Sequence, residues 1–342
     1  MEEGTGQGCQ PLVSLVIPCY NEQEVFPALR GALVSLAERL APKYRAELVL
    51  VDDGSRDSTW DHIVEFARQD ARVRGIALSR NFGHQVALTC GYDLASGDAV
   101  VSLDADLQDP PEVVVEFVRA WEKGADVVFG VRKTRQGESR FKLWTAAWFY
   151  RLFQAVGHAS APAHSGDFRL MSKRSLLALR RLREKHRYIR GMVGWIGFRT
   201  ATVEYDRMPR AAGVTKYPLR RMLAFSLDAL VSFSSFPLRL AYVFAIAGCL
   251  VVLAYLVNAL VRYLAYGTPL VPGWTSLIVT VTLFGSLTLF CLGLVGEYVG
   301  RIYDQSKNRP LYLIREMVRE GAEAGSEGAP TEATEGDSYG SN

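Results

Sequence analysis

Short apolar segments alternate with longer amphipathic segments through the N-terminal part of this chain of 342 residues. Five of the apolar segments have strand character, and helical periodicity separates them: residues 12–18, 47–51, 76–78, 100–103 and 125–131. Regular alternation of strands and helices requires crossover connections, which join parallel strands. The pattern therefore predicts an α/β domain with a doubly wound, mostly parallel sheet that is flanked by helices.

Polar side chains follow four of these predicted strands at the point where each strand ends. The loops are residues 20–22, 52–55, 79–83 and 104–109. The carboxyl ends of parallel strands meet at one edge of the sheet, and open α/β sheets bind their ligands there. We expect the four loops to converge on one rim, which is the first candidate for a functional site.

The last of these loops carries three carboxylates and an amide, at Asp104, Asp106, Gln108 and Asp109. Two prolines follow, as is typical of the first turn of a helix. The carboxylates of an Asp-x-Asp pair are hard oxygen ligands that suit Mg²⁺ or Mn²⁺, and such cations often hold a substrate diphosphate. An isolated Asp-x-Asp is most often a solvated turn, so the metal site is a hypothesis that depends on the rest of the chain.

Other phosphate-binding motifs are absent from the sequence. No Gly-x-Gly-x-x-Gly follows the first predicted strand and no Gly-x-x-x-x-Gly-Lys-Ser/Thr occurs. Their absence argues against a dinucleotide-dependent oxidoreductase and a P-loop NTPase. A formal net charge of +3 without a long basic stripe argues against nucleic acid as a partner. A bound phosphate then needs another cation, which a metal at Asp104 and Asp106 would supply.

Two segments near the C-terminus, residues 240–261 and 273–296, contain no charged residue and are long enough to cross a bilayer. Arg and Lys residues flank the pair on both outer sides, and the positive-inside rule then places both termini in the cytoplasm. The prediction is a multi-pass protein of the inner, cytoplasmic membrane, with its α/β domain on the cytoplasmic side. Two buried helices of a soluble protein are the alternative.

The region between the α/β pattern and the apolar segments is basic and aromatic. A basic loop next to the predicted rim either binds phosphate or is simply solvated, and its charges are Arg132, Lys133, Arg135, Arg140 and Lys142. The aromatic segment 143–156 is either an interfacial helix or a core helix, and residues 217–237 are amphipathic enough to lie along a membrane surface.

These boundaries predict six parts of the chain. They are a flexible N-terminus (1–11), a cytoplasmic α/β domain (12–216), an interfacial helix (217–237), two transmembrane helices (238–298), a cytoplasmic C-terminal segment (299–320) and a tail (321–342). The tail is rich in Gly, Glu, Ser and Thr, a composition typical of disorder.

Four motifs, in this order, resemble the polyprenyl-phosphate glycosyltransferases of glycosyltransferase family 2, a group that includes dolichol-phosphate mannose synthase. They are Pro18-x-Tyr20-Asn21-Glu22, Asp52-Asp53-Gly54-Ser55, Asp104-Ala105-Asp106-x-Gln108 and Arg210-x-x-Gly213-x-Thr215-Lys216-Tyr217. Residues 79–83, residues 166–171 and the paired apolar segments are most similar to the bactoprenol glucosyltransferase branch. The resemblance covers residues 12–315, and the ordered set of motifs is far more specific than any one of them.

The resemblance implies a GT-A fold and the transfer of a sugar, with inversion, from a nucleotide sugar to a polyprenyl phosphate in the membrane. By nearest resemblance the donor is UDP-glucose, the acceptor is undecaprenyl phosphate and the cofactor is Mg²⁺ or Mn²⁺. Mannose, N-acetylglucosamine and a 4-amino-arabinose derivative stay open as the sugar. Some similar enzymes are tetramers, so a homo-oligomer is a further expectation.

The resemblance also assigns roles to individual residues. Contacts to the nucleotide sugar are expected from Pro18, Tyr20, Glu22, Asp53, Asp104, Ala105, Arg210 and Lys216. Asp104, Asp106 and Gln108 match the metal site. Arg132, Arg135 and Arg140 match the lipid-phosphate site. The residues expected to carry catalysis are Asp106, Asp167 and Arg132.

The chemistry of the acceptor limits what Asp167 needs to do. A phosphate monoester has a second pKa of about 6, so its attacking oxygen is already ionised and no general base is required. We therefore expect Asp167 to position the acceptor or to orient an arginine, with a structural pair to Arg169 as the alternative.

Two other functions stay open at this stage. A processive polysaccharide synthase is disfavoured because only two spans are predicted and no Gln-x-x-Arg-Trp motif occurs. A non-catalytic, membrane-tethered sensor of nucleotide sugars would need no acceptor site, which argues against it.

Overall fold

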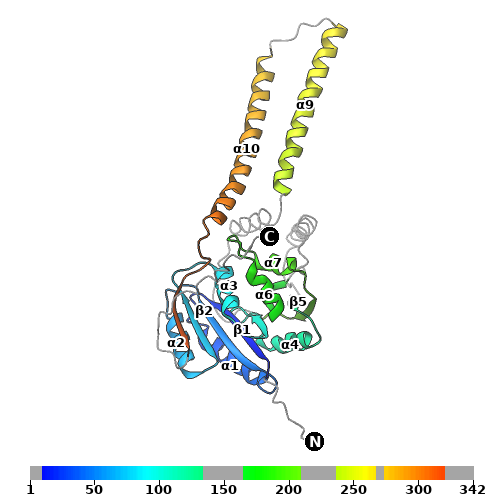
Figure 1. Ribbon diagram of the computed structural model, residues 1–342. Coiled ribbons are helices and arrows are strands. Elements are labelled where there is room, and N and C mark those ends of the chain that lie inside the picture. The colour runs from blue at the N-terminus through cyan, green and yellow to red at the C-terminus, as the bar shows by residue number, and fades with distance from the viewer. Residues whose placement is uncertain (1–9, 134–164, 209–235, 267–272, 320–342) are drawn as a thin grey trace, which may run out of the picture.

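The computed structural model describes residues 10–133, 165–208, 236–266 and 273–319. Within them the chain forms an eight-stranded sheet in the order β7-β5-β6-β4-β1-β2-β3-β8 (Figure 1). The strands are β1 (Leu12–Cys19), β2 (Arg45–Asp52), β3 (Val73–Leu78), β4 (Ala99–Ser102), β5 (Val127–Arg132), β6 (Ser165–Ser172), β7 (Thr200–Tyr205) and β8 (Ile314–Arg319).

The predicted parallel core of the sheet is confirmed. β3, β2, β1 and β4 lie side by side and parallel, and β5 is parallel to β7. β6 runs antiparallel between β4 and β5, an arrangement that local periodicity did not predict. Because β6 is reversed, its first residues lie at the edge where β4 ends, and Arg169 is paired with Ser102.

Helices cover both faces of the sheet, as the alternation predicted (Figure 1). One face holds α1 (Phe26–Leu40), α2 (Thr59–Gln69), the 3₁₀ turn η1 (Pro111–Val113) and α4 (Val114–Glu122). The other holds α3 (His84–Leu94), α6 (Lys173–Arg181) and α7 (Ile189–Trp195). Successive side chains of a strand point to opposite faces, so Leu15 and Ile17 pack in the first core and Val16 packs in the second.

β8 is an element that the sequence did not predict. It pairs antiparallel with β3 at the edge of the sheet, although the polypeptide reaches it only after the two long C-terminal helices. Side chains strengthen this return: Trp60 Nε1 donates to Glu316 Oε2 at 3.2 Å and Tyr312 Oη donates to Asp93 Oδ2 at 3.0 Å. A short, charged segment is typical of an edge strand, which gives little apolar signal in the sequence.

The two C-terminal helices, α9 (Phe236–Tyr266) and α10 (Trp274–Ser306), project as a pair from the α/β domain (Figure 1). Among the described residues one helical segment, Val279–Ser306, is long and apolar enough to cross a membrane, and the apolar stretch found in α9 is shorter, Ala245–Tyr255. Apolar side chains on both helices are exposed, with Leu264 at 74% and Leu289 at 71%. One candidate span is therefore present, and the second span stays a prediction.

Candidate active site

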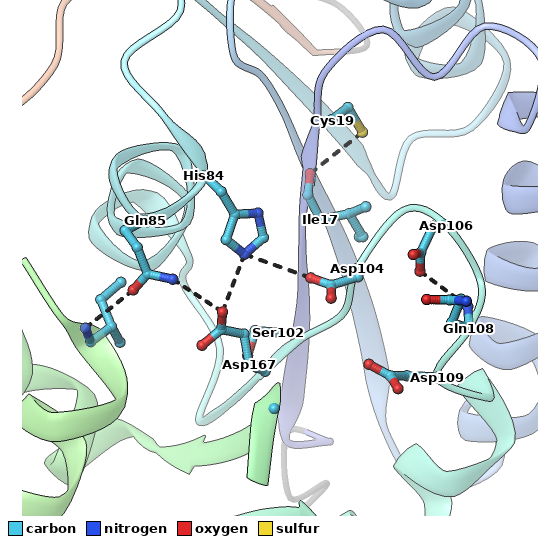
Figure 2. A network of polar contacts seen from close by, with 12 residues as sticks. Ile17, Cys19, His84, Gln85, Ser102, Asp104, Asp106, Gln108, Asp109 and Asp167 are labelled. Carbon is cyan, nitrogen blue, oxygen red and sulfur yellow. Dashed lines mark hydrogen bonds and ion pairs between the residues drawn. The ribbon is translucent and has the colours of Figure 1, made fainter. Parts of the chain in front are cut away.

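The predicted rim forms where strand ends and loops meet. The loops after β1, β2, β3 and β4 all leave the carboxyl ends of parallel strands, and the reversed β6 brings Asp167 to the same edge. Figure 2 shows the centre of this rim, with Asp104 and Asp167 on either side of His84 and with Asp106, Gln108 and Asp109 along the acidic loop, residues 104–109.

The loop after β1 is attached to the loop after β2 by backbone and side-chain hydrogen bonds. The Asn21 amide donates to Ser55 Oγ at 3.0 Å, the Arg56 amide donates to Asn21 Oδ1 at 2.9 Å, and the Glu22 amide donates to Thr59 Oγ1 at 2.8 Å. The motif residues of this loop therefore lie beside the loop that carries Asp53. Pro18 is buried, and the Tyr20 side chain is 41% exposed at the surface.

Asp53 connects the loop after β2 to the loop after β3. Its buried carboxylate accepts hydrogen bonds from the amides of Phe82 at 2.7 Å and Gly83 at 2.9 Å. Gly54 has φ +66°, and a Cβ there would lie 2.4 Å from the Arg80 carbonyl carbon, so only glycine allows the two loops to approach this closely. Asp53 thus has a structural role at the rim, and its predicted role in recognising the nucleotide stays a prediction.

The acidic loop is held in a tight conformation. The Gln108 amide donates to Asp106 Oδ1 at 3.1 Å, Ala105 is buried, and Leu107 adopts the left-handed region with φ +53°, which is costly for a residue other than glycine. Gln108 Oε1 and Asp109 Oδ2 are buried without a hydrogen-bond partner in the described part of the chain. Buried oxygens of this kind need a hydrogen-bond donor or a cation.

The residues of the acidic loop fit a divalent cation that is shared with a diphosphate. Among the described residues no three His, Cys, Asp or Glu side chains are grouped closely enough to hold a metal by themselves. Mg²⁺ in phosphate-binding sites needs only one or two carboxylates, because waters and phosphate oxygens complete its coordination. Burial raises the pKa of Asp104 to about 6, and three neighbouring carboxylates add to this effect against the opposing charge of His84. A cation would relieve this concentration of negative charge.

Asp167, in contrast, already has cationic partners. Arg169 is completely buried, and its Nη2 donates to Asp167 Oδ1 at 2.5 Å. Gln85 Nε2 donates to Asp167 Oδ2 at 3.0 Å, and Arg190 Nη2 lies 4.0 Å from Oδ1. Burial alone would raise the pKa of Asp167, but its contact with His84 and the charges of the two arginines outweigh burial and hold the pKa well below its usual range. The pair with Arg169 that we considered as an alternative is present, and this setting is unsuited to a proton acceptor.

His84 is a residue of the rim that the sequence reasoning missed. It begins α3 directly after Gly83, which has φ +98°. Its Nε2 lies 3.4 Å from Asp167 Oδ2 and 3.7 Å from Asp104 Oδ1. Burial lowers the pKa of His84, but the hydrogen bond to Asp167 and the charges of both carboxylates outweigh it, so the pKa is raised. Its position directly after a predicted rim loop was the signal that could have identified it.

Arg132, at the end of β5, is attached to the acidic loop through Asp109 and Tyr205. Tyr205 Oη donates to Asp109 Oδ1 at 2.6 Å, Arg132 Nε donates to Tyr205 Oη at 3.3 Å, and Arg132 Nη2 lies 3.4 Å from Asp109 Oδ1. The Arg132 side chain is 29% exposed and can still meet a ligand. Asp109 and Tyr205 were not among the predicted site residues, and their contact joins segments 96 residues apart.

Four predicted site residues, Arg135, Arg140, Arg210 and Lys216, lie outside the residues that the structure describes. Met208, the last described residue before Arg210, lies next to the acidic loop, because its amide donates to the Gln108 carbonyl at 2.9 Å.

Comparisons with known proteins agree with the resemblance found in the motifs. Residues 14–180 match the family model described as Glycosyl transferase family 2. The chain is 44% identical over 304 residues to the uncharacterized glycosyltransferase YkcC of Bacillus subtilis (strain 168), covering 88% of this chain and 93% of that protein. It is 38% identical over 307 residues to the SfII prophage-derived bactoprenol glucosyl transferase of Shigella flexneri, covering 90% and 98%.

Among solved structures the chain is similar to mannosyl-3-phosphoglycerate synthase from Rubrobacter xylanophilus, with a TM-score of 0.45 and 18% identity over 64% of this chain and 71% of that chain. On the strength of the relatives' identity and coverage, the chain belongs to glycosyltransferase family 2. Its mostly parallel sheet between two layers of helices is the GT-A-like α/β arrangement that the motifs implied.

Proposed function

We propose that this protein transfers a hexose, with inversion, from a nucleotide sugar to a polyprenyl phosphate at the cytoplasmic face of a membrane, and makes a lipid-linked sugar for modification of cell-envelope glycans. UDP-glucose and undecaprenyl phosphate are the proposed substrates. Relatives named bactoprenol glucosyl transferase, which match nearly their whole length to this chain, support this choice over mannose, N-acetylglucosamine or an aminoarabinose derivative.

The observation that carries the proposal is the pairing of opposite charges at the rim. The acidic loop has two buried oxygens without a hydrogen-bond partner in the described part of the chain, and Arg132 lies beside it at 3.4 Å from Asp109. An enzyme that joins a diphosphate donor to a phosphate acceptor must hold two anions close together. A metal site next to a partly exposed arginine side chain suits that task, since a guanidinium can bind phosphate oxygens in a bidentate manner.

The proposed reaction is one displacement at the anomeric carbon of the sugar. An ionised oxygen of the lipid phosphate forms the new bond to this carbon while the bond to the donor diphosphate breaks, and the electron pair leaves with the nucleoside diphosphate. Asp104, Asp106 and Gln108 would hold a divalent cation, which when bound neutralises the charge that develops on the leaving diphosphate. Arg132 aligns the acceptor phosphate, and Asp167 keeps neighbouring cationic side chains in position rather than accepting a proton.

The apolar helices would keep this site beside the bilayer. Two spans, with both termini in the cytoplasm, remain our proposal for the topology, and the flanking Arg and Lys residues support it. The return of the chain to the sheet through β8 attaches the end of α10 to the α/β domain, so the rim would be held at a constant height relative to the lipid headgroups.

Purified full-length protein tests the proposal directly. The protein is given undecaprenyl phosphate, Mn²⁺ and one donor at a time from a panel of UDP-glucose, UDP-N-acetylglucosamine, GDP-mannose and a 4-amino-arabinose nucleotide. We expect one glucosylated lipid on thin-layer chromatography, with its mass confirmed by mass spectrometry and with UDP released in equal amount. Release of UDP without a lipid product, or binding of nucleotide sugar without turnover for any donor, would contradict the proposal.

A further inference from the structure

A continuous line of polar contacts crosses the rim through His84 (Figure 2). It begins at the Ile189 amide at the start of α7, which donates to Gln85 Oε1 at 3.1 Å. Gln85 Nε2 then donates to Asp167 Oδ2 at 3.0 Å. His84 Nε2 continues the line, because it lies 3.4 Å from the same Asp167 oxygen and 3.7 Å from Asp104 Oδ1.

The two carboxylates that His84 joins, Asp167 and Asp104, differ in how firmly they are held. Asp167 is fixed from several sides, since Arg169 and Gln85 engage both of its carboxylate oxygens. For the Asp104 carboxylate, the pair with His84 is the one ion pair or hydrogen bond found within the described part of the chain. The orientation of Asp104 therefore depends on His84 to a degree that the orientation of Asp167 does not.

His84 is itself in a rigid place. The amides of the two residues before it, Phe82 and Gly83, both donate to the buried carboxylate of Asp53. Gly83 is the N-cap of α3, and its φ of +98° allows the sharp entry into the helix. The backbone before His84 is held by Asp53, and its ring is held by Asp167. His84 can therefore act as a fixed support for the Asp104 carboxylate.

We propose that His84 is a positioning residue, whose imidazole, braced by Asp167, holds the Asp104 carboxylate in the orientation that receives the divalent cation and the donor diphosphate. This inference rests on the proposed function and deepens it. It also gives Asp167 a role that acts through His84 rather than through contact with the reacting atoms. Side chains that orient a metal-binding carboxylate typically change metal affinity about 10- to 100-fold when they are lost.

Two substitutions of His84 distinguish a residue that positions Asp104 from one that only fills space at the start of α3. In His84→Gln the amide nitrogen reaches about as far from the backbone as the imidazole Nε2 and can still donate toward both carboxylates. In His84→Asn the amide is one carbon shorter and falls short of them. His186→Asn is the matched control, because His186 Nε2 also lies 3.7 Å from an aspartate, Asp304, at a similarly exposed position outside the rim.

The primary measurement is Mn²⁺ binding to the full-length protein in the presence of UDP, followed by electron paramagnetic resonance without turnover. We expect His84→Asn to weaken Mn²⁺ binding about 10- to 100-fold, and His84→Gln and His186→Asn to stay close to the wild type. In the kinetic assay, His84→Asn should raise the KM for the nucleotide sugar and leave the KM for the lipid unchanged. Thermal melting of each variant establishes that it is folded.

Three results would overturn the inference. The first is wild-type Mn²⁺ affinity in His84→Asn, because Asp104 would then not depend on His84. The second is equal loss of binding in the Asn and Gln variants with a fall in melting temperature, which would make the role of His84 structural. The third is a wild-type protein that binds no Mn²⁺ with UDP, which removes the metal site and the proposed function together. If the binding results are as expected but no lipid-linked sugar forms, the proposed function fails and the role of His84 stands.

Discussion

The acidic loop after β4 and the first residues of β6 present the same chemical group, a carboxylate, to the two sides of His84. Their surroundings are opposite. Asp167 is paired with a buried arginine, and its pKa lies well below the usual range, whereas burial and other carboxylates raise the pKa of Asp104 to about 6. Asp167 is paired with an arginine of the protein itself, whereas the one ion pair of Asp104 in the described part of the chain is to His84, a partner that Asp167 shares. The difference supports our proposal that the Asp104 side of the rim, rather than the Asp167 side, receives the metal and the donor diphosphate.

Removal of the cation should have the largest effect. We expect EDTA to abolish transfer, Mn²⁺ or Mg²⁺ to restore it, and Asp106→Ala to lower kcat/KM by about 10³-fold, since the charge on the leaving diphosphate would be uncompensated. Asp61→Ala, on the exposed surface of α2, is the control and should behave as the wild type. Full turnover in EDTA would contradict a metal site at the acidic loop, and with it the proposed difference between Asp104 and Asp167.

The Asp167→Asn substitution should destabilise the protein more than any other change on the β6 side. It leaves the completely buried Arg169 without its countercharge, and breaking such a buried pair costs about 3–5 kcal/mol. A fall in melting temperature of about 6–12 °C is expected, measured by differential scanning fluorimetry.

The same variant also tests whether Asp167 is a base. Among the molecules that remain folded below that melting temperature, we expect measurable transfer with an unchanged pH–rate profile. If the acidic limb of the profile disappears, Asp167 accepts a proton and its comparison with Asp104 needs revision.

Arg132→Ala should weaken the acceptor and spare the donor. Loss of a charge-assisted contact to phosphate costs about 1.5–3 kcal/mol, which corresponds to about a 10- to 100-fold rise in the KM for undecaprenyl phosphate. Lysine should rescue only part of the loss, because it lacks the planar fork of donors. Calorimetry of the nucleotide sugar without lipid should be unaffected.

The matched control for this substitution is Arg174→Ala. Arg174 forms an ion pair with Asp126 at the amino end of β5, so it lies at the edge of the sheet opposite to the rim. We expect its KM values to remain as in the wild type. Collapse of donor binding in Arg132→Ala, with lipid dependence unchanged, would assign Arg132 to the diphosphate instead.

The smallest expected effect is on stability, in metal-free Asp104→Asn, and it is a gain, whereas Asp167→Asn should cause a loss. The pKa of Asp104 is raised from its ordinary 3.8 to about 6 in the folded protein, so the folded state holds a proton that the unfolded chain releases. The wild type therefore loses stability as pH rises from about 4 to about 6. Metal-free Asp104→Asn lacks this loss, and we expect it to be more stable at pH 8 by about 1 kcal/mol, or about 2–4 °C in melting temperature, after allowance for partial solvent screening.

This gain should shrink toward zero as the pH falls to about 4 and below, where Asp104 is protonated in the folded protein and becomes protonated in the unfolded chain as well. It should reverse when Mn²⁺ is added, because the wild type gains more binding energy from the cation than the variant does. Melting curves at several pH values, with EDTA and then with Mn²⁺, provide the measurement. A loss of stability in metal-free Asp104→Asn at pH 8 would show that Asp104, like Asp167, is already neutralised by its surroundings.

The order of strands and helices, the parallel core and the rim could be predicted from the sequence because they depend on local signals. Apolar runs of strand length, helical periodicity and polar loops at strand ends are read within a few residues. The acidic loop was identified in the same way, since Asp104, Asp106 and Gln108 lie within five consecutive residues. The motifs then pointed to the family to which the relatives belong.

Only the tertiary structure decided which distant residues meet at that rim. The reversed β6 between β4 and β5 brings Asp167 to the end of β4, and Gln85 meets Asp167 across 82 residues of sequence. The pairing of β8 with β3 and the position of His84 between two carboxylates have the same origin. Local periodicity specifies that a strand forms but not its neighbour or its direction, because those depend on how the whole sheet packs its two apolar faces against the helices.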